Sequence, residues 1–415
     1  MAIVKLDIQK EIEMKNDNPC PPGSSIEISR RGFLKGALVS AGALSVGSYN
    51  AAAQMVGGPS VIGWGVPPGL VRIDSNENAL GPSPRAVEAV ASLIYSINRY
   101  GQNPDLLGKI ARRHGVPVVE WTDSPFTPAE NAWVTVGAGS SDLLFAIGHA
   151  FLRDEQEVVE SVPGFGFMTR LAALQDSKSV RVPLLPGMKP DLDQLSDSVT
   201  DRTAMVVVTS PGNPTGQLTP MSYLKPFIAS IPEQVLILVD EAYIEFAENT
   251  EDRIGAAPLI EDYPNVIVTR TFSKIFGMAG MRVGYAVAQP EIIARINSHR
   301  GNTLTLLSTH AASAALDDED HVLRSRDLVV QGKRYFYEQF DTMGIDYVPS
   351  ESSFLMANVK TDVDQLARRL REDYQVLVGN AKQRWGLEGW IRITAGLPEE
   401  NKAFITALKK ILVSS

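Results

Sequence analysis

Short hydrophobic runs and segments with helical spacing alternate through the middle of the chain. The runs of strand length after residue 156 are Glu157–Val162, Val180–Leu184, Ala204–Thr209, Val235–Val239, Val266–Thr269 and Val283–Ala288. Runs of this kind are typical of strands that are covered on both faces. The pattern therefore predicts an α/β fold with a mostly parallel sheet, whose ligands would lie at the carboxyl ends of the strands.

A further strand is expected upstream, at Val134–Val136, followed by small and polar residues at 137–142. Apolar side chains then recur every four residues from Leu143 to Phe151, so a helix should begin near Ser140. The free backbone N–H groups at such a helix start can hold a phosphate. Many strand-to-helix turns look the same, so a purely structural turn is the alternative.

The two ends of the mature chain have a different character. Residues 73–84 suggest an extended arm and a turn, followed by a helix to about residue 97 that 98–101 would close. A long, charge-rich helical stretch is expected over 298–342. Strands near 353–359 and 390–396, each followed by a helix, then predict a smaller α+β domain.

Composition indicates a globular protein with a small-molecule ligand. The 415 residues are 44% hydrophobic and 21% charged, and the net charge is −9, so the chain has no basic surplus for nucleic acid. Cys20 is the single cysteine, which excludes an intramolecular disulfide. The histidines are scattered without the spacing of metal ligands, and we assign no metal.

The N-terminal segment reads as an export signal. Ser29–Lys35 (S-R-R-G-F-L-K) is similar to the twin-arginine signal, and a short apolar run follows at 36–44. Cleavage is expected near Ala53, with release to the periplasm after passage through the twin-arginine export machinery. An uncleaved extension with a chance arginine pair is the alternative. The expected divisions are a leader at 1–53, an arm with the first helix at 54–100, a large domain at 101–297 and a small domain at 298–415.

The stretch from Thr269 to Gly284 carries the clearest candidate chemistry. It places hydroxyl groups, Lys274, several glycines and Arg282 directly after a predicted strand. An amine nucleophile beside donors for a phosphate ester suits pyridoxal phosphate, which has both an aldehyde and a phosphate. The alternative is a surface loop with a solvated lysine and arginine.

Separate motifs in a fixed order then point to a family. They are S-P-G-N-P-T-G from Ser210, D-E-A-Y-I-E-F from Asp240, R-T-F-S-K from Arg270 and M-A-G-M-R-V-G-Y from Met278. Together they resemble the pyridoxal-phosphate-dependent class I/II aminotransferases, in their histidinol-phosphate aminotransferase-like branch, from about Asp74 onwards. The resemblance implies the aspartate-aminotransferase fold, also called fold type I, pyridoxal 5'-phosphate as the cofactor and a homodimer.

The resemblance also implies roles around the cofactor ring. Lys274 would form the Schiff base and act as the acid and base, while Asp240 would pair with the ring nitrogen. Tyr243 and Asn213 would bond the phenolate oxygen, and Phe165 would stack on the ring. A structural role in the core is the alternative for Phe165 and Tyr243.

At the phosphate end, the residues implied by the resemblance are Ala138, Gly139, Ser140, Thr271, Ser273 and Arg282. Tyr100 resembles the tyrosine that reaches the phosphate from the neighbouring subunit, so the active site would need a dimer. An ordinary aromatic residue at a helix end is the alternative for Tyr100.

Arg392 resembles the arginine that binds the substrate carboxylate, with Asn213 beside it. In its expected strand, Arg392 lies on the same face as Trp390 and Thr394, whereas Ile391 and Ile393 lie on the other face. Histidinol-phosphate enzymes carry a second arginine shortly before it, for the substrate phosphate, where this chain places Gly379. Another basic residue of the segment, at 382 or 384, would compensate if the loop is shifted.

The expected function is transfer of an amino group between an amino acid or related amine and a 2-oxo acid, on a substrate other than histidinol phosphate. A decarboxylase or an oxidase using the same cofactor is the first alternative, because the fold does not fix the reaction. An exported binding protein without catalysis is the second, and an intact set of Lys274, Asp240 and Arg282 argues against it.

Overall fold

The computed structural model describes residues 63–119, 131–301 and 303–413. The twin-arginine segment, Cys20 and the expected cleavage site near Ala53 lie outside these residues. Within the described ranges, no helix combines the length and apolar character that a membrane span requires. The division into leader, arm, large and small domain stays a prediction.

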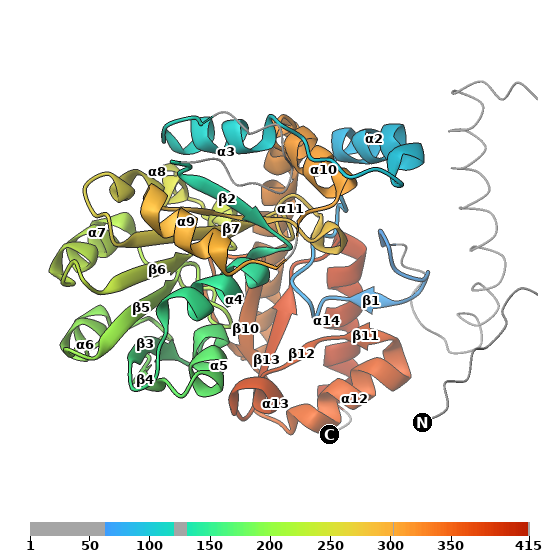
Figure 1. Cartoon of the computed structure of the whole chain (residues 1–415). Coiled ribbons are helices and arrows are strands. Elements are labelled where there is room, and N and C mark those ends of the chain that lie inside the picture. Colours follow the sequence, from blue (N-terminus) through green and yellow to red (C-terminus); the bar gives the residue numbers. More distant parts are fainter. Residues whose placement is uncertain (1–62, 120–130, 302, 414–415) are drawn as a thin grey trace, which may run out of the picture. The chain divides into compact units, whose positions relative to one another are not determined.

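A seven-stranded sheet forms the larger part of the fold, with strand order β2-β8-β7-β6-β5-β3-β4 (Figure 1). Its strands are β2 (Val134–Gly137), β3 (Glu157–Val162), β4 (Lys178–Pro183), β5 (Thr203–Thr209), β6 (Leu236–Asp240), β7 (Val266–Thr271) and β8 (Gly284–Val287). The strands from β4 to β7 pair in parallel, whereas β8 runs antiparallel to both of its neighbours. The expected mostly parallel α/β sheet is confirmed.

Alternate residues of the central strands pack into different hydrophobic clusters, which is why the runs contain almost no polar residue. Val206 and Val208 of β5 belong to one cluster, together with Phe227 of a helix on that face. Met205 and Val207 of the same strand belong to the other. Both faces of the sheet are therefore buried, as the continuous hydrophobic runs predicted.

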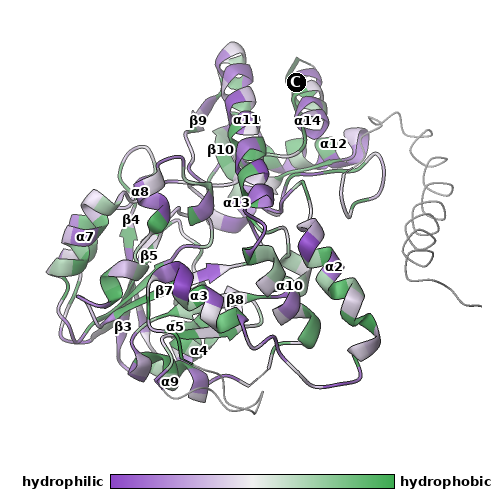
Figure 2. Cartoon of the chain, turned by 90° about the horizontal axis from the view of Figure 1, so that it is seen from above, coloured by the Kyte–Doolittle hydropathy of each residue, from purple (hydrophilic) through white to green (hydrophobic). Residues whose placement is uncertain are grey.

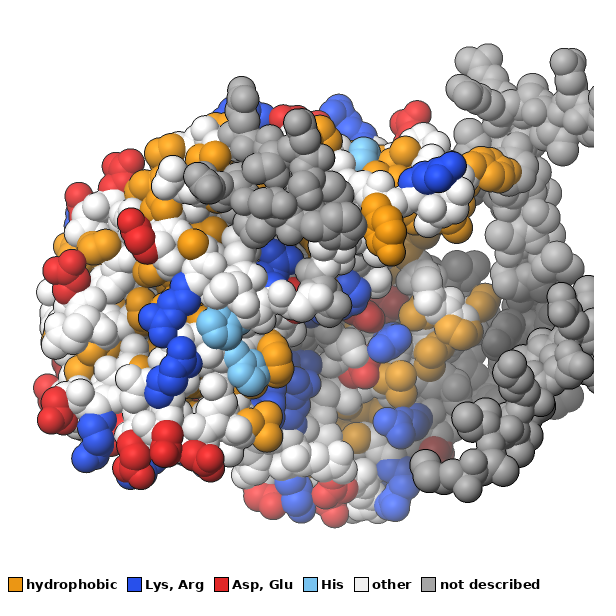
Figure 3. Space-filling model, in the orientation of Figure 1, with side chains coloured by type: hydrophobic (Ala, Val, Ile, Leu, Met, Phe, Trp, Pro, Cys, Tyr) orange, Lys and Arg blue, Asp and Glu red, His pale blue; other side chains and the backbone are white. Residues whose placement is uncertain are grey.

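Helices cover this sheet and extend from its ends. They are α2 (Pro84–Leu93), α3 (Leu106–His114), α4 (Ser140–Phe151), α5 (Phe167–Leu174), α6 (Leu192–Asp197), α7 (Met221–Ser230), α8 (Thr250–Ile254) and α9 (Pro290–Ser298). Helix α4 begins at Ser140, as the sequence pattern predicted. The side chains on the face drawn in Figure 3 are mixed, with acidic, basic and hydrophobic groups interspersed.

A four-stranded antiparallel sheet, in the order β12-β13-β10-β9, forms the second part. Its strands are β9 (Asp346–Val348), β10 (Phe354–Asn358), β12 (Gly379–Asn380) and β13 (Trp390–Thr394). The accompanying helices are α10 (Leu306–Leu316), α11 (Glu319–Met343), α12 (Val363–Tyr374), α13 (Ala381–Trp385) and α14 (Pro398–Val413). Helices α11 and α14 pack against each other (Figure 2).

The short strand β1 (Val71–Arg72) joins the N-terminal arm to this part of the chain, because it pairs in parallel with β11 (Val376–Leu377). The long helix expected over 298–342 is divided into α10 and α11. Thr305 caps α10 by accepting a hydrogen bond from the Ser308 N–H, and Asp318 caps α11 by accepting one from the His321 N–H. Each cap begins a new helix, which the charge pattern alone did not reveal.

Candidate active site

A cavity of about 910 Å³ lies where the carboxyl ends of β5, β6 and β7 meet β13. The expected site residues that line it are Ser140, Phe165, Asn213, Asp240, Tyr243, Thr271, Ser273, Lys274, Arg282 and Arg392. Residues from both sheets and from several distant motifs therefore share one space. Its volume is in the range that small-molecule sites occupy.

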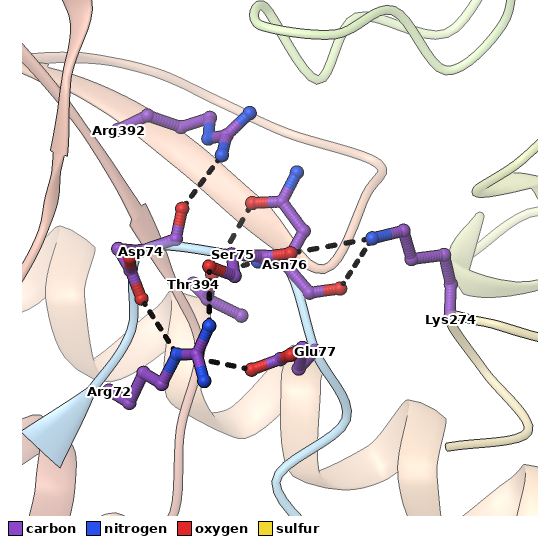
Figure 4. Close-up of polar contacts among 8 residues, drawn as sticks. All are labelled: Arg72, Asp74, Ser75, Asn76, Glu77, Lys274, Arg392 and Thr394. Carbon is purple, nitrogen blue, oxygen red and sulfur yellow. Dashed lines mark hydrogen bonds and ion pairs between the residues drawn. The ribbon is translucent and has the colours of Figure 1, made fainter. Parts of the chain in front are cut away.

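Lys274 follows β7 and reaches toward the N-terminal arm (Figure 4). Its Nζ donates hydrogen bonds to the backbone oxygens of Asn76, at 3.1 Å, and Ser75, at 3.4 Å. The same atom lies 5.6 Å from the centre of the Tyr243 ring. The arm thus holds the amine at the cavity, in contact with carbonyl oxygens and an aromatic ring.

Asp240 is the last residue of β6 and its side chain is buried. Burial raises the pKa of its carboxyl group from 3.8 to about 6, although the Thr269 hydroxyl donates a hydrogen bond to it at 3.2 Å. A carboxylate in this position lacks the solvation that water would give, so a cationic partner in the cavity would favour its charged form.

The Tyr243 hydroxyl is oriented by the arm. Asn76 Nδ2 donates a hydrogen bond to it at 3.0 Å, and the backbone N–H of Asn76 donates to the Thr394 hydroxyl, also at 3.0 Å. Asn76 has a φ of 56°, a left-handed conformation that asparagine tolerates better than most residues. The hydrogen bonds on both sides of Asn76 hold it in that conformation.

Arg282 and the start of α4 form one corner of the cavity. Arg282 donates to the Ser273 hydroxyl and to the Ala138 oxygen, both at 3.4 Å. Helix α4 has no side-chain cap at its N terminus, and its first residues, Ser140 and Ser141, line the cavity. A Cβ atom at Gly139, whose φ is 82°, would collide with the Arg282 guanidinium. This corner is suited to a phosphate group.

Arg392 lies at the other end of the cavity and is only 3% exposed. It donates at 2.8 Å to Asn213 Oδ1 and at 2.8 Å to the Asp74 oxygen, while its Nε has no hydrogen-bond partner. Burial lowers the pKa of the guanidinium to about 10, which leaves it charged at neutral pH. A buried cation whose hydrogen bonds go to neutral oxygens is suited to receive an anion.

Gly379 lies directly opposite Arg392 in the pairing of β12 with β13. A Cβ atom at this position would stand 3.0 Å from the Arg392 oxygen and 3.6 Å from its Nε. Lys382 is paired with Asp364 and Glu388, at 3.4 Å and 3.3 Å. Arg384 lines the cavity.

Tyr100, Ala138 and Gly139 are the expected site residues that do not line the cavity. Ala138 and Gly139 contact the Arg282 side chain, which itself lines the cavity. Tyr100 is 86% exposed and borders a separate pocket beside Thr303–Leu307. Its expected role in a neighbouring subunit stays a prediction, since the structure contains one chain.

Sequence reasoning missed the arm residues Asp74, Ser75 and Asn76, and also Trp385, all of which line the cavity. The polar run around Asn76 in an otherwise extended arm was the available signal. Nothing in the pattern around Trp385 distinguishes it from a core residue.

The model of the family described as "Aminotransferase class I and II" matches residues 68–408. A histidinol-phosphate aminotransferase from Akkermansia muciniphila is 35% identical over 351 residues, which cover 83% of this chain and 91% of that protein. The structure of a histidinol-phosphate aminotransferase from Sinorhizobium meliloti, in complex with pyridoxal-5'-phosphate, is 27% identical with a TM-score of 0.71, covering 83% of this chain and 91% of that one. Aspartate aminotransferase from Thermus thermophilus shares the fold, with a TM-score of 0.70, 22% identity and coverage of 89% and 96%.

Proposed function

Because this chain belongs to the class I and II aminotransferase family, we propose that the cavity between its two sheets holds the cofactor at Lys274, Asp240 and Arg282 and the substrate at Arg392. The protein is a pyridoxal-phosphate-dependent transaminase, which moves an amino group between an amino acid or related amine and a 2-oxo acid. When bound, the cofactor supplies a carbonyl group for the amine and a ring that accepts electrons from the substrate.

One observation carries the assignment of roles. Asp240 ends strand β6, and Lys274 follows the end of the adjacent parallel strand β7; both line the same cavity. An amine nucleophile and a buried carboxyl group in one site fit the two ends of a protonated pyridine aldehyde. The raised pKa of Asp240 supports this fit, because a cationic ring nitrogen would favour the charged carboxylate.

At the corner formed by Arg282 and the start of α4, the phosphate would be held by Arg282, Ser273, Thr271 and the uncapped start of the helix. The backbone N–H of Ser273 donates a hydrogen bond to the Thr271 hydroxyl at 3.1 Å, which holds the Thr271 side chain in place. Phe165 lines the cavity and would cover the ring.

Lys274 would then move the proton. Its amine would stay tethered beside the bound substrate, where it would act as the base for the substrate Cα proton. The oxygens of Ser75 and Asn76 accept its hydrogen bonds and so hold the amine on the cavity side of the arm. Tyr243, oriented by Asn76, would donate to the ring oxygen.

The substrate is proposed to differ from histidinol phosphate. Arg392 offers a buried cation for a carboxylate, whereas Gly379 supplies no side chain beside it for a phosphate. Lys382 is already paired with Asp364 and Glu388, whereas Arg384 lines the cavity with its guanidinium 5.0 Å from the centre of the Trp385 ring. The substrate proposed for this end of the cavity is an amino acid whose free carboxylate pairs with Arg392.

Two further proposals concern the whole chain. Tyr100 is highly exposed, and we propose that it completes the phosphate site of a second copy of the chain. Sedimentation of the cleaved protein would test the dimer through its mass. Ser29–Lys35 would direct export to the periplasm, with cleavage near Ala53. Changing both Arg30 and Arg31 to Lys should retain the protein in the cytoplasm if this is right.

The reaction class is tested with purified, cofactor-loaded protein and a panel of amino donors and 2-oxo acids. We expect formation of a new amino acid to match consumption of the donor, one for one. Release of carbon dioxide or hydrogen peroxide without amino transfer would instead identify a decarboxylase or an oxidase.

A further inference from the structure

The indole of Trp385 lies against the buried guanidinium at the substrate end of the cavity. The Arg392 Cζ is 5.3 Å from the centre of the Trp385 ring and 5.2 Å from the centre of the Phe354 ring. Arg392 is therefore held by two aromatic rings as well as by its hydrogen bonds to Asn213 and Asp74. Attraction of this kind is strongest when water is excluded, as it is here.

Trp385 is itself fixed by a contact across the cavity wall. Its Nε1 donates a hydrogen bond at 2.9 Å to the oxygen of Gly164, in the turn between β3 and α5. That turn also carries Phe165, which lines the cavity. The indole thus links the helix α13 of the smaller part to the wall beside the expected cofactor ring.

The short helix α13 is held in turn by α12. Asn380 caps α13 by accepting a hydrogen bond from the Gln383 N–H. Asn380 Nδ2 and Gln383 Nε2 both donate to Asp364 Oδ1 of α12, each at 2.7 Å. These contacts place Trp385, at the end of α13, without using its own side chain.

We propose that Trp385 is a positioning residue for the substrate carboxylate, which holds the Arg392 guanidinium in the orientation that accepts the carboxylate while its N–H anchors the indole on Gly164. This inference rests on the proposed role of Arg392. The indole matters most for the Arg392 Nε, because that atom has no hydrogen-bond partner among the described residues to orient it.

The test uses two oxyamines that react with the carbonyl of the bound cofactor, aminooxyacetate and methoxyamine, of which only the first carries a carboxylate. Their reaction rates with the loaded protein are followed through the loss of cofactor absorbance. The ratio of the two rates measures recognition of the carboxylate without any knowledge of the natural substrate.

We expect the wild-type protein to prefer aminooxyacetate, and Trp385→Leu to reduce that preference roughly tenfold, as a ratio in which any change common to both rates cancels. Trp385→Phe keeps a ring but loses the N–H, so its preference for aminooxyacetate should lie between that of the wild type and that of Trp385→Leu. The matched controls are Trp390→Leu and Trp390→Phe, because Trp390 packs in the same small hydrophobic cluster but does not line the cavity.

Arg392→Lys separates failure of this inference from failure of the proposed function. If Arg392→Lys loses the preference while both Trp385 variants keep it, the positioning role of Trp385 is wrong and the role of Arg392 stands. If Arg392→Lys also keeps the preference, the assignment of the carboxylate to Arg392 is wrong. Should Trp385→Leu fail to fold, equal ratios for Trp385→Phe and Trp390→Phe would overturn the inference.

Discussion

Asp240 connects chemistry to stability at the level of a single side chain. It ends a strand whose other residues are apolar, and burial raises the pKa of its carboxyl group to about 6. A buried carboxyl group of this kind costs stability when it ionises without a partner. The cofactor's ring nitrogen would remove that cost, so the same residue should destabilise the empty protein and stabilise the loaded one.

Asp240→Asn should reveal this cost through its pH dependence. The unfolded chain gives up the proton at a lower pH than the folded chain, so the stability of the cofactor-free wild type falls as pH rises from about 4 to about 6. The difference in pKa between 3.8 and about 6 corresponds to a loss of roughly 3 kcal/mol in the free energy of unfolding. Asp240→Asn has no carboxyl group at this position, so its stability should not fall in this way.

Thermal melts of cofactor-free protein at about pH 4 and about pH 7 provide the measurement. The melting temperature of Asp240→Asn, compared with that of the wild type, should be higher at about pH 7 than at about pH 4. Adding pyridoxal phosphate should stabilise the wild type more than the variant. An unchanged difference at both pH values would contradict a buried Asp240 carboxyl group that has no cationic partner in the empty protein.

The turn after Lys274 shows how one element fixes another. Gly277 has a φ of 66°, and a Cβ atom there would collide with the backbone of Gly81 and Pro82, at the end of the arm. The arm in turn supplies the oxygens that hold the Lys274 amine. Close approach of these two backbones therefore positions the Lys274 amine.

Gly277→Ala should lower stability by roughly 1–3 kcal/mol and weaken retention of pyridoxal phosphate, because it strains the turn and displaces the arm. Gly280→Ala is the matched control in the same loop, where a Cβ atom would meet nothing within 4 Å. Melting temperature and cofactor content after dialysis give the comparison. Equal behaviour of the two variants would show that the turn does not position the arm.

The elements that could be predicted from sequence are those whose signal is local. The strands β5 and β6 follow from continuous hydrophobic runs, and α4 follows from four-residue spacing after small residues. The division between α10 and α11 depends on capping by Thr305 and Asp318 within a segment that is helical on both sides, so its overall pattern did not mark the break. The antiparallel direction of β8 depends on which neighbours it pairs with, which a single run does not contain.

At the scale of the molecule, the site is assembled from segments that are far apart in the chain. Lys274, Asp240 and Asn213 were predictable because each follows a strand within a recognisable motif. Asn76 was missed because its role arises from contacts with Tyr243 and Thr394, which only the tertiary structure brings together. Trp385 was missed for the same reason, since its partner Gly164 is more than two hundred residues away.

Amino transfer by this protein is proposed to depend on Lys274 at the cavity. The most direct measurement is the absorbance of the loaded protein while an amino donor and then a 2-oxo acid are added, for wild type, Lys274→Ala and the control Lys178→Ala, whose lysine is exposed on β4. We predict that wild type and the control convert reversibly between the aldehyde and amine forms of the cofactor. Lys274→Ala should bind the cofactor but lose the conversion by at least about a thousandfold. Conversion at the wild-type rate in Lys274→Ala would show that amino transfer does not depend on Lys274.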